Sequence, residues 1–408
     1  MLSKLENYNN KYIINLFLYL ILPLYLLAGG YYLFSFKYIF PIYMLIVFYL
    51  IIKTLNNQFN LEINKLLNKR NLFFIIIFLQ SGLYIFRAIN HRSIYEFQNI
   101  FIGLIIIFLM QYFLDLNRIL TLNTIIKIVI LILSINFFIS FFVFGNYNTP
   151  YANRNALTTL FVILTPILFA EVVTKKNLTI NISLLSAIGY ITILANSRIN
   201  LIAFFVQFVL TILFILKNSV LKYKKVVILS FIIIILIVSP LAIHHIVRSS
   251  RGNIIEQFHN ENSSLSIRLH FIKEGFQIFL DNPIFGVGSG NINVPRYTYE
   301  TDQTINNLHN LVIDILAKYG VITFSIFVYI SYTLIKDYFV LKIPPDNPFY
   351  HFRVALIIFL MSFPILSNTV STIFHMRAFY FIFGYFILVI AKLKNNSLFE
   401  KEYIYEQN

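Results

Sequence analysis

The chain has 408 residues, of which 58% are hydrophobic and only 12% are charged, and its mean hydropathy is +0.76. Soluble domains carry about 25% charged residues, so this composition excludes a single soluble domain. The absence of cysteine excludes disulfides, thiolate metal ligands and cysteine nucleophiles, and the net charge of +15 lies in short loops between apolar runs rather than on a surface that would bind nucleic acid.

Apolar runs long enough to cross a bilayer recur along the whole sequence. At roughly 20 residues a span, we expect about twelve transmembrane helices in an all-α polytopic bundle, which forms one integral membrane domain over residues 1–408. The polar tail after Leu393 is expected to be loose. The expected spans are 12–30, 38–55, 71–88, 97–115, 124–144, 156–173, 178–196, 199–216, 226–246, 309–334, 353–372 and 377–393.

Lysine residues gather in alternate loops of this arrangement. Because cytoplasmic loops of membrane proteins carry the excess of positive charge, we expect these loops, and both termini, to lie in the cytoplasm. The one long polar loop, residues 247–308, then lies on the outer side. The residues that set this orientation are Lys53, Lys65, Lys69, Arg70, Lys175, Lys176, Lys217, Lys222, Lys224, Lys225, Lys336, Lys342, Lys392 and Lys394.

Most arginines fall on the other side. Orientation needs only positive charge, whereas the planar guanidinium binds phosphate through two parallel hydrogen bonds. A single outer arginine is explained by a side chain that reaches the lipid headgroups, but the whole set indicates that anionic groups bind there. The nine outer arginines of the twelve in the chain are Arg87, Arg92, Arg154, Arg198, Arg248, Arg251, Arg268, Arg296 and Arg377.

The long outer loop contains one predicted helix, residues 264–280. Ser263 or Ser264 can cap its start, and Asp281-Asn282-Pro283 ends it. Arg268 falls on its apolar face, so we expect an interfacial helix that rests on the outer membrane surface with Arg268 near the headgroups. The apolar stripe consists of Phe271, Ile272, Gly275, Phe276 and Phe279.

Three positions are candidates for chemistry at the outer mouth of the bundle. His309 stands where the long loop enters the tenth span, and a histidine there can act as a general base near neutral pH; the alternative is a capping or interfacial histidine. Arg198 opens the eighth span, where free N–H groups of a helix N-terminus attract anions. Arg154 opens the sixth span in the same way and is an auxiliary candidate. The alternative for both arginines is membrane anchoring.

Other motifs carry less chemistry. Gly286-Val287-Gly288-Ser289-Gly290 lacks the strand and helix of a dinucleotide site, so it predicts a tight turn that returns the loop over the bundle. Adjacent His244 and His245 diverge on a helix and have no acidic partners, so no metal site is predicted. Asp314 and Lys318 are spaced to form an ion pair on one helix.

Three stretches together resemble the bacterial O-antigen ligase and polymerase superfamily. Ser197-Arg198 begins a span after a short outer turn. Ser266-Ile267-Arg268 leads through the loop helix to the run from Asp281 to Gly288. Leu308-His309-Asn310 continues to Lys318-Tyr319-Gly320-Val321-Ile322.

This resemblance implies an enzyme of the bacterial cytoplasmic (inner) membrane with its active site on the periplasmic side. Such enzymes move a glycan from undecaprenyl diphosphate to an acceptor hydroxyl with inversion, using no cofactor, metal or nucleotide sugar. Arg198 and Arg268 would bind the diphosphate, His309 would deprotonate or orient the acceptor, and Arg154 and Asn310 would be auxiliary.

The resemblance leaves the acceptor open. A ligase of lipopolysaccharide biosynthesis uses lipid A-core. Chain length, the single large late loop and the polar ending near Ser367-Asn368 and Arg377 look more like the ligases. A polymerase uses another lipid-linked glycan. A transporter of lipid-linked glycans is a remote alternative, because it requires polar groups near mid-span, where this sequence has very few.

Overall fold

A computed structural model of the protein describes residues 17–27, 69–87, 91–144, 154–217, 264–288, 308–341, 349–368 and 376–405, with a few single residues besides. In chain order its elements are η1 (Phe17–Ile21), α2 (Leu22–Leu27), η2 (Lys69–Asn71), α5 (Leu72–Arg87), α6 (His91–Phe113), α7 (Leu116–Phe144), α8 (Arg154–Val173), α9 (Leu178–Leu194), α10 (Arg198–Lys217), α13 (Ser264–Asp281), β1 (Val294–Pro295), β2 (Thr304–Ile305), α14 (Leu311–Val340), α15 (Tyr350–Leu366) and α16 (Arg377–Tyr405).

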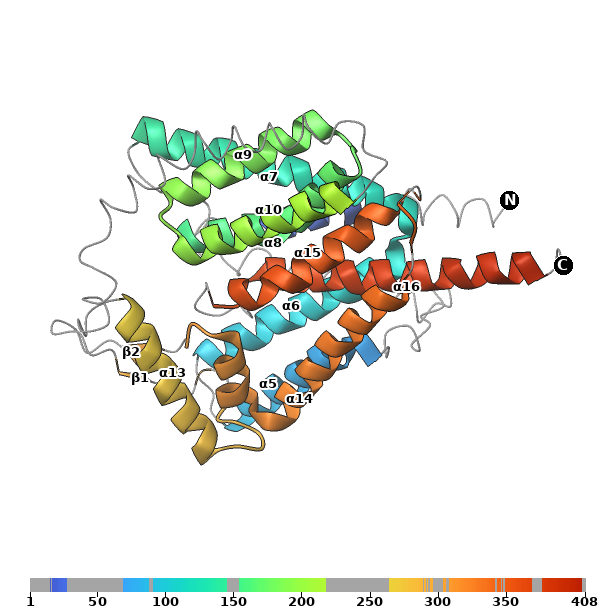
Figure 1. The fold of residues 1–408 in the computed structure, drawn as a ribbon. Helices are drawn as coiled ribbons and strands as arrows, with labels where there is room; N and C mark the ends of the chain where they lie inside the picture. The colour runs from blue at the N-terminus through green and yellow to red at the C-terminus, as the bar shows by residue number, and fades with distance from the viewer. Residues whose placement is uncertain are drawn as a thin grey trace.

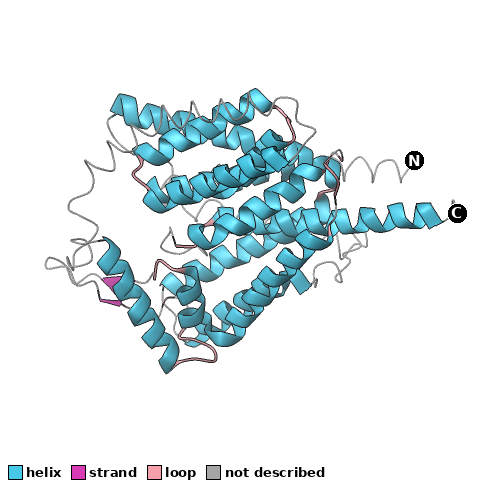
Figure 2. Ribbon diagram, viewed as in Figure 1, coloured by secondary structure: helices cyan, strands magenta, loops and turns pink. Residues whose placement is uncertain are grey.

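The predicted helical membrane bundle is confirmed (Figure 2). Within the described residues, six helices are long and apolar enough to cross a membrane, and three apolar helices are shorter. The strands form only a two-residue antiparallel ladder. Predicted spans 38–55 and 226–246, and loop residues 247–263, lie outside the described residues, so the expected total of about twelve spans stays a prediction.

Three helices end several residues from the predicted position. Helix α14 ends at Val340 instead of residue 334. Helix α16 continues to Tyr405, beyond the expected end at 393, because the polar tail contains helix-forming Lys and Glu residues and no Gly or Pro. Helix α15 ends at Leu366 instead of residue 372, and Asn368 follows directly after its last turn.

Helix α8 lies at the centre of the bundle, because every residue from Leu157 to Val173 is buried. A helix that is apolar on all sides needs neighbours on all sides. Gln207 of α10 donates from Nε2 to the Val162 carbonyl (2.9 Å) and to Ser362 Oγ of α15 (3.0 Å).

Asn200, about two helical turns before Gln207, bonds Thr159 of α8 (3.0 Å), so α8 and α10 run parallel. His351, at the start of α15, lies 3.3 Å from Lys176, just after α8, so α15 runs antiparallel to them. The starts of α8 and α10 therefore lie at the same end of the bundle as the finish of α15, and we call this the site end.

Helix α13 lies across the site end, beside the first part of α14 (Figure 1). Phe271 is buried, and a side chain at Gly275 would come within 2.5 Å of Ile313. Part of the predicted apolar stripe thus packs on protein, a contact that the expectation of a helix resting on the outer membrane surface did not include. A second apolar face, formed by Leu269, Phe276 and Leu280, is about half exposed and remains the face that can enter the outer leaflet.

Helix α14 is broken at Gly320, where φ is 75° and ψ is −178°. The loop after α13 replaces the lost helical hydrogen bonds, and the predicted tight turn lies there, with positive φ at Gly286 and Gly288. Tyr84 of α5 holds the same loop through its hydroxyl, which donates to the Phe285 carbonyl. The replacing bonds run from Val287 N to Ala317 O (2.9 Å), from Gly288 N to Lys318 O (2.9 Å) and from Val321 N to Pro283 O (2.8 Å).

Replacing Gly320 by alanine is expected to destabilise the protein strongly. The backbone there is in the left-handed region, and an added Cβ would overlap the Ile284 carbonyl. Strained backbone of this kind costs about 1–3 kcal/mol before the overlap is counted. Gly82→Ala is the matched control, since its Cβ would meet the Phe97 ring at an ordinary 3.4 Å. Thermal unfolding in detergent should show a much larger decrease in Tm for Gly320→Ala; equal decreases would contradict this.

A buried charged group joins α6 to α14 just before the break. The Tyr319 hydroxyl donates to Glu96 (2.7 Å), and Lys318 Nζ lies 3.5 Å from Glu96 and 3.3 Å from Asp314. The predicted Asp314–Lys318 pair is thereby confirmed. At the opposite end of α14, Asp337 pairs with Arg70 and Lys394.

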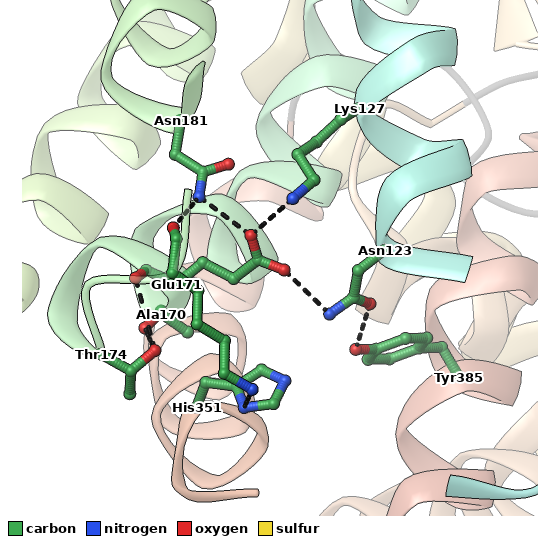
Figure 3. Close-up of polar contacts among 9 residues, drawn as sticks. Asn123, Lys127, Ala170, Glu171, Thr174, Asn181, His351 and Tyr385 are labelled. Atoms are coloured by element: carbon green, nitrogen blue, oxygen red, sulfur yellow. Dashed lines mark hydrogen bonds and ion pairs between the residues drawn. The ribbon is translucent and has the colours of Figure 1, made fainter. Parts of the chain in front are cut away.

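A second buried polar cluster lies at the far end of α8 (Figure 3). Glu171 accepts from Lys127 Nζ of α7 (2.7 Å), from Asn123 Nδ2 (3.2 Å) and from Asn181 Nδ2 of α9 (2.9 Å). Tyr385 of α16 donates to Asn123 (2.8 Å). The cluster therefore joins four helices around one carboxylate.

Candidate functional site

His309 precedes α14 and has an unusual backbone, with φ of 54°. Asn310, the next residue, caps α14 by accepting from the Ile313 N–H (3.0 Å). The His309 ring stacks on the Phe271 ring of α13, with centroids 5.7 Å apart and planes 10° from parallel. Leu308, the residue before His309, is fully buried in a small hydrophobic cluster that also contains Phe271. The imidazole is thus held in place by α13 and by the start of α14.

Arg268 reaches the same place from one turn earlier on α13. Its Nη1 donates to the Asn368 carbonyl (3.2 Å), just beyond the end of α15. Burial lowers the pKa of the guanidinium, but arginine keeps its charge in proteins. The carbonyl end of a helix favours a cation, so α15 supplies a suitable neighbour for Arg268.

Burial, with a smaller contribution from the Arg268 charge, lowers the pKa of His309 to about 4. The ring is therefore neutral at physiological pH and has a lone pair available. In the described part of the protein, Nδ1 is buried and has no hydrogen-bond partner. A buried nitrogen of this kind favours a bound hydroxyl or phosphate oxygen, because an unpaired polar group away from water is costly.

The lowered pKa of His309 predicts a pH-dependent stability. The unfolded chain binds a proton at this residue below about pH 6.5, whereas the folded protein does so only near pH 4. Stability should therefore be complete above pH 6.5 and decrease as the pH falls toward 4. We expect His309→Gln to reduce the difference between Tm at pH 7 and at pH 5. The same difference in both proteins would contradict the lowered pKa.

Arg154 and Arg198 form a second pair at the site end. Each is exposed, and each is the first residue of its helix, α8 or α10. The fully buried Asn200 joins the two helix starts, because its amide bonds the side chains of Thr158 and Thr159 of α8. Two helix N-termini with two guanidinium groups therefore face the same side, an arrangement suited to an anion.

The structure brings Arg268, His309 and Asn310 together directly. It places Arg154 and Arg198 at two helix starts that Asn200 joins, at the same end of the bundle, with α15 packed against α8 and α10. Sequence reasoning missed Asn368, Phe271 and Asn200 as contributors. A single polar residue, such as Asn200 or Asn368, at a membrane-helix end is the signal that was available.

Residues 182–328 match the family described as O-Antigen ligase. This region contains Arg198, Arg268 and His309, and it supports the resemblance to the ligase and polymerase superfamily that the motifs indicate.

A relative shares part of this chain. The teichuronic acid biosynthesis protein TuaE of Bacillus subtilis (strain 168) is 32% identical over 91 residues, which cover 21% of this chain and 18% of the relative. The match thus spans less than a fifth of that protein's length. With the family match, it supports a membrane enzyme that processes glycans.

Proposed function

We propose that the protein is an O-antigen ligase-type glycosyltransferase, which moves a glycan from undecaprenyl diphosphate to a hydroxyl of lipid A-core. The observation that carries this proposal is the pairing of Arg268 with His309. A fixed cation and a neutral imidazole with an unpaired nitrogen lie side by side at one end of a membrane bundle. One can stabilise a leaving diphosphate and the other can take a proton from an alcohol.

The proposed reaction uses the residues in a single displacement. The acceptor hydroxyl oxygen attacks the anomeric carbon of the glycan and forms the new glycosidic bond. Its proton passes to His309. The bond between the anomeric carbon and the phosphate oxygen breaks, and the electron pair leaves with undecaprenyl diphosphate, whose charge Arg268 and Arg198 stabilise. Arg154 is an auxiliary ligand, and Asn310 holds the start of α14.

We place the site on the outer face of the cytoplasmic membrane. The basic residues Arg70, Lys176 and Lys394 gather at the opposite end of the bundle, where Arg70 and Lys394 contact Asp337 and Lys176 lies beside His351. Their position supports that end as the cytoplasmic one. A diphosphate-linked lipid would then meet Arg268 at the depth of the outer headgroups.

A second candidate function is polymerisation of a lipid-linked glycan. The similarity to a teichuronic acid biosynthesis protein supports this alternative, and the same groups would serve both reactions. The two functions differ only in the acceptor, which is lipid A-core for a ligase and a second lipid-linked glycan for a polymerase.

The purified protein in liposomes tests both functions. It is given a glycan on undecaprenyl diphosphate, with and without lipid A-core, and the products are separated on a gel. Transfer to lipid A-core with release of undecaprenyl diphosphate supports the ligase. A ladder of longer chains without lipid A-core supports the polymerase and overturns the ligase. If neither product forms, the proposal of glycan transfer is overturned altogether.

A further inference from the structure

Asn368, which follows the last turn of α15, connects Arg268 of α13 to Asn310 at the start of α14. Its carbonyl oxygen accepts from Arg268 Nη1 (3.2 Å), and its side-chain Oδ1 accepts from Asn310 Nδ2 (2.7 Å). Its own Nδ2 donates to the Pro364 carbonyl (2.8 Å). One asparagine therefore contacts α13, the start of α14 and its own helix.

Both polar atoms of the Asn310 side-chain amide form hydrogen bonds. Its Oδ1 caps α14 through the Ile313 N–H, while its Nδ2 is bound to Asn368. One residue further, the Leu311 N–H donates to the Ser367 carbonyl (3.2 Å). The end of α15 and the start of α14 are thus joined at Asn310 and at Leu311. His309, with its left-handed backbone, directly precedes this junction.

We propose that Asn368 is a positioning residue that sets the placement of Arg268 relative to His309. This inference rests on the proposed glycan transfer. The leaving diphosphate and the acceptor hydroxyl must meet one anomeric carbon together, and a displacement of about 1 Å can cost about 100-fold in rate. Without the Asn368 side chain, Asn310 loses its bond to the residue whose carbonyl holds Arg268, and the bond from the Leu311 N–H to the Ser367 carbonyl is left to join the two helices.

Neither alanine nor aspartate provides all of these contacts. Alanine keeps the backbone carbonyl for Arg268 but removes the bond to Asn310. Aspartate keeps an acceptor for Asn310, loses the donor to Pro364, and adds a negative charge next to Arg268. That charge competes with a diphosphate for the guanidinium. The two substitutions should therefore affect different kinetic constants.

The test compares Asn368→Ala and Asn368→Asp with a matched control. Asn347→Ala is suitable, because Asn347 bonds the Phe349 N–H (2.9 Å) at the other end of the same helix. In the liposome assay, we expect Asn368→Ala to lower kcat about 10- to 100-fold. We expect Asn368→Asp to act mainly by raising the KM for the donor. Asn347→Ala should keep wild-type kinetics, and Tm should fall by similar small amounts in Asn368→Ala and the control.

A double-mutant cycle separates positioning from general damage. Asn310→Ser keeps a capping oxygen for α14 but lacks the amide donor. If Asn368 acts through Asn310, the Asn310→Ser/Asn368→Ala protein should have the kcat of the slower single variant. Additive losses, a wild-type kcat in Asn368→Ala, or a fall in Tm that accounts for the lost activity would each overturn the proposal.

A binding measurement distinguishes failure of this proposal from failure of the proposed function. The probe is undecaprenyl diphosphate without a glycan. It is added to wild type, Asn368→Ala, Asn368→Asp and Asn347→Ala. We expect Asn368→Asp to bind it about tenfold more weakly than wild type, which corresponds to about 1.4 kcal/mol. If wild type binds the probe but transfers no glycan, the proposal of glycan transfer fails, and the binding data still test the role of Asn368. If Asn368→Asp binds as wild type does, the positioning proposal fails whatever the activity.

Discussion

Replacing His309 by glutamine is expected to abolish nearly all glycan transfer while the protein stays folded. Glutamine retains a polar side chain of similar reach but cannot accept a proton from an alcohol. Loss of a general base costs about 100- to 10,000-fold in rate. The measurement is kcat in the liposome assay, with Tm in detergent to show that the fold is intact. His309→Ala should behave in the same way, although it also removes the stack on Phe271.

The matched control for this experiment is His270→Gln. His270 is also half-buried, lies on α13 next to Phe271, and has Nδ1 3.9 Å from Glu274 rather than beside Arg268. We expect it to retain transfer close to the wild-type rate. If His309→Gln kept full output, or if both variants lost it equally, His309 would not be the general base.

Glu171→Met is expected to destabilise the protein by about 3–5 kcal/mol, because it leaves a buried ammonium group without its counter-charge. Lys127 is only 7% exposed and lies 2.7 Å from the Glu171 carboxylate. The substitution also removes the acceptor of Asn123 and Asn181. The effect should appear as a large decrease in Tm, or as failure to recover folded protein from the membrane.

The reason for this loss can be tested by removing the second charge. Lys127→Met/Glu171→Met should be more stable than Glu171→Met alone, since replacing both members of a buried pair is often nearly neutral. The exposed pair of Asp115 and Arg118, 3.7 Å apart, is the control. Asp115→Asn should cost no more than about 1 kcal/mol. A double variant less stable than Glu171→Met would show that burial of the lysine charge is not the cause.

Local sequence patterns predicted the elements well. Helix α13 spans Ser264–Asp281, against a predicted 264–280, because a capping serine and the Asp-Asn-Pro stop act within a few residues of the helix ends. The predicted spans from 71–88 to 199–216 each overlap one helix, from α5 to α10. Such signals depend on hydropathy and on neighbours along the chain, so they can be read without knowing what the helices pack against.

The apolar face of α13 is a feature whose packing partner could not be predicted from the sequence. The sequence contains an apolar stripe, and a stripe can meet either lipid or protein. Gly275 permits close approach of α14, and Phe271 stacks on His309. Which partner a stripe selects depends on the shape of the neighbouring helix, which hydropathy does not encode.

The sequence by itself determined that this is a helical membrane protein, that Arg198, Arg268 and His309 are candidates for one site, and that Asp314 pairs with Lys318. Only the tertiary structure decided that Arg268 meets Asn368, a hundred residues further along the chain, and that the loop after α13 completes the break in α14. The physical reason is range. Helix formation and membrane insertion depend on residues within a turn or a span of each other, whereas these contacts depend on how separate helices pack.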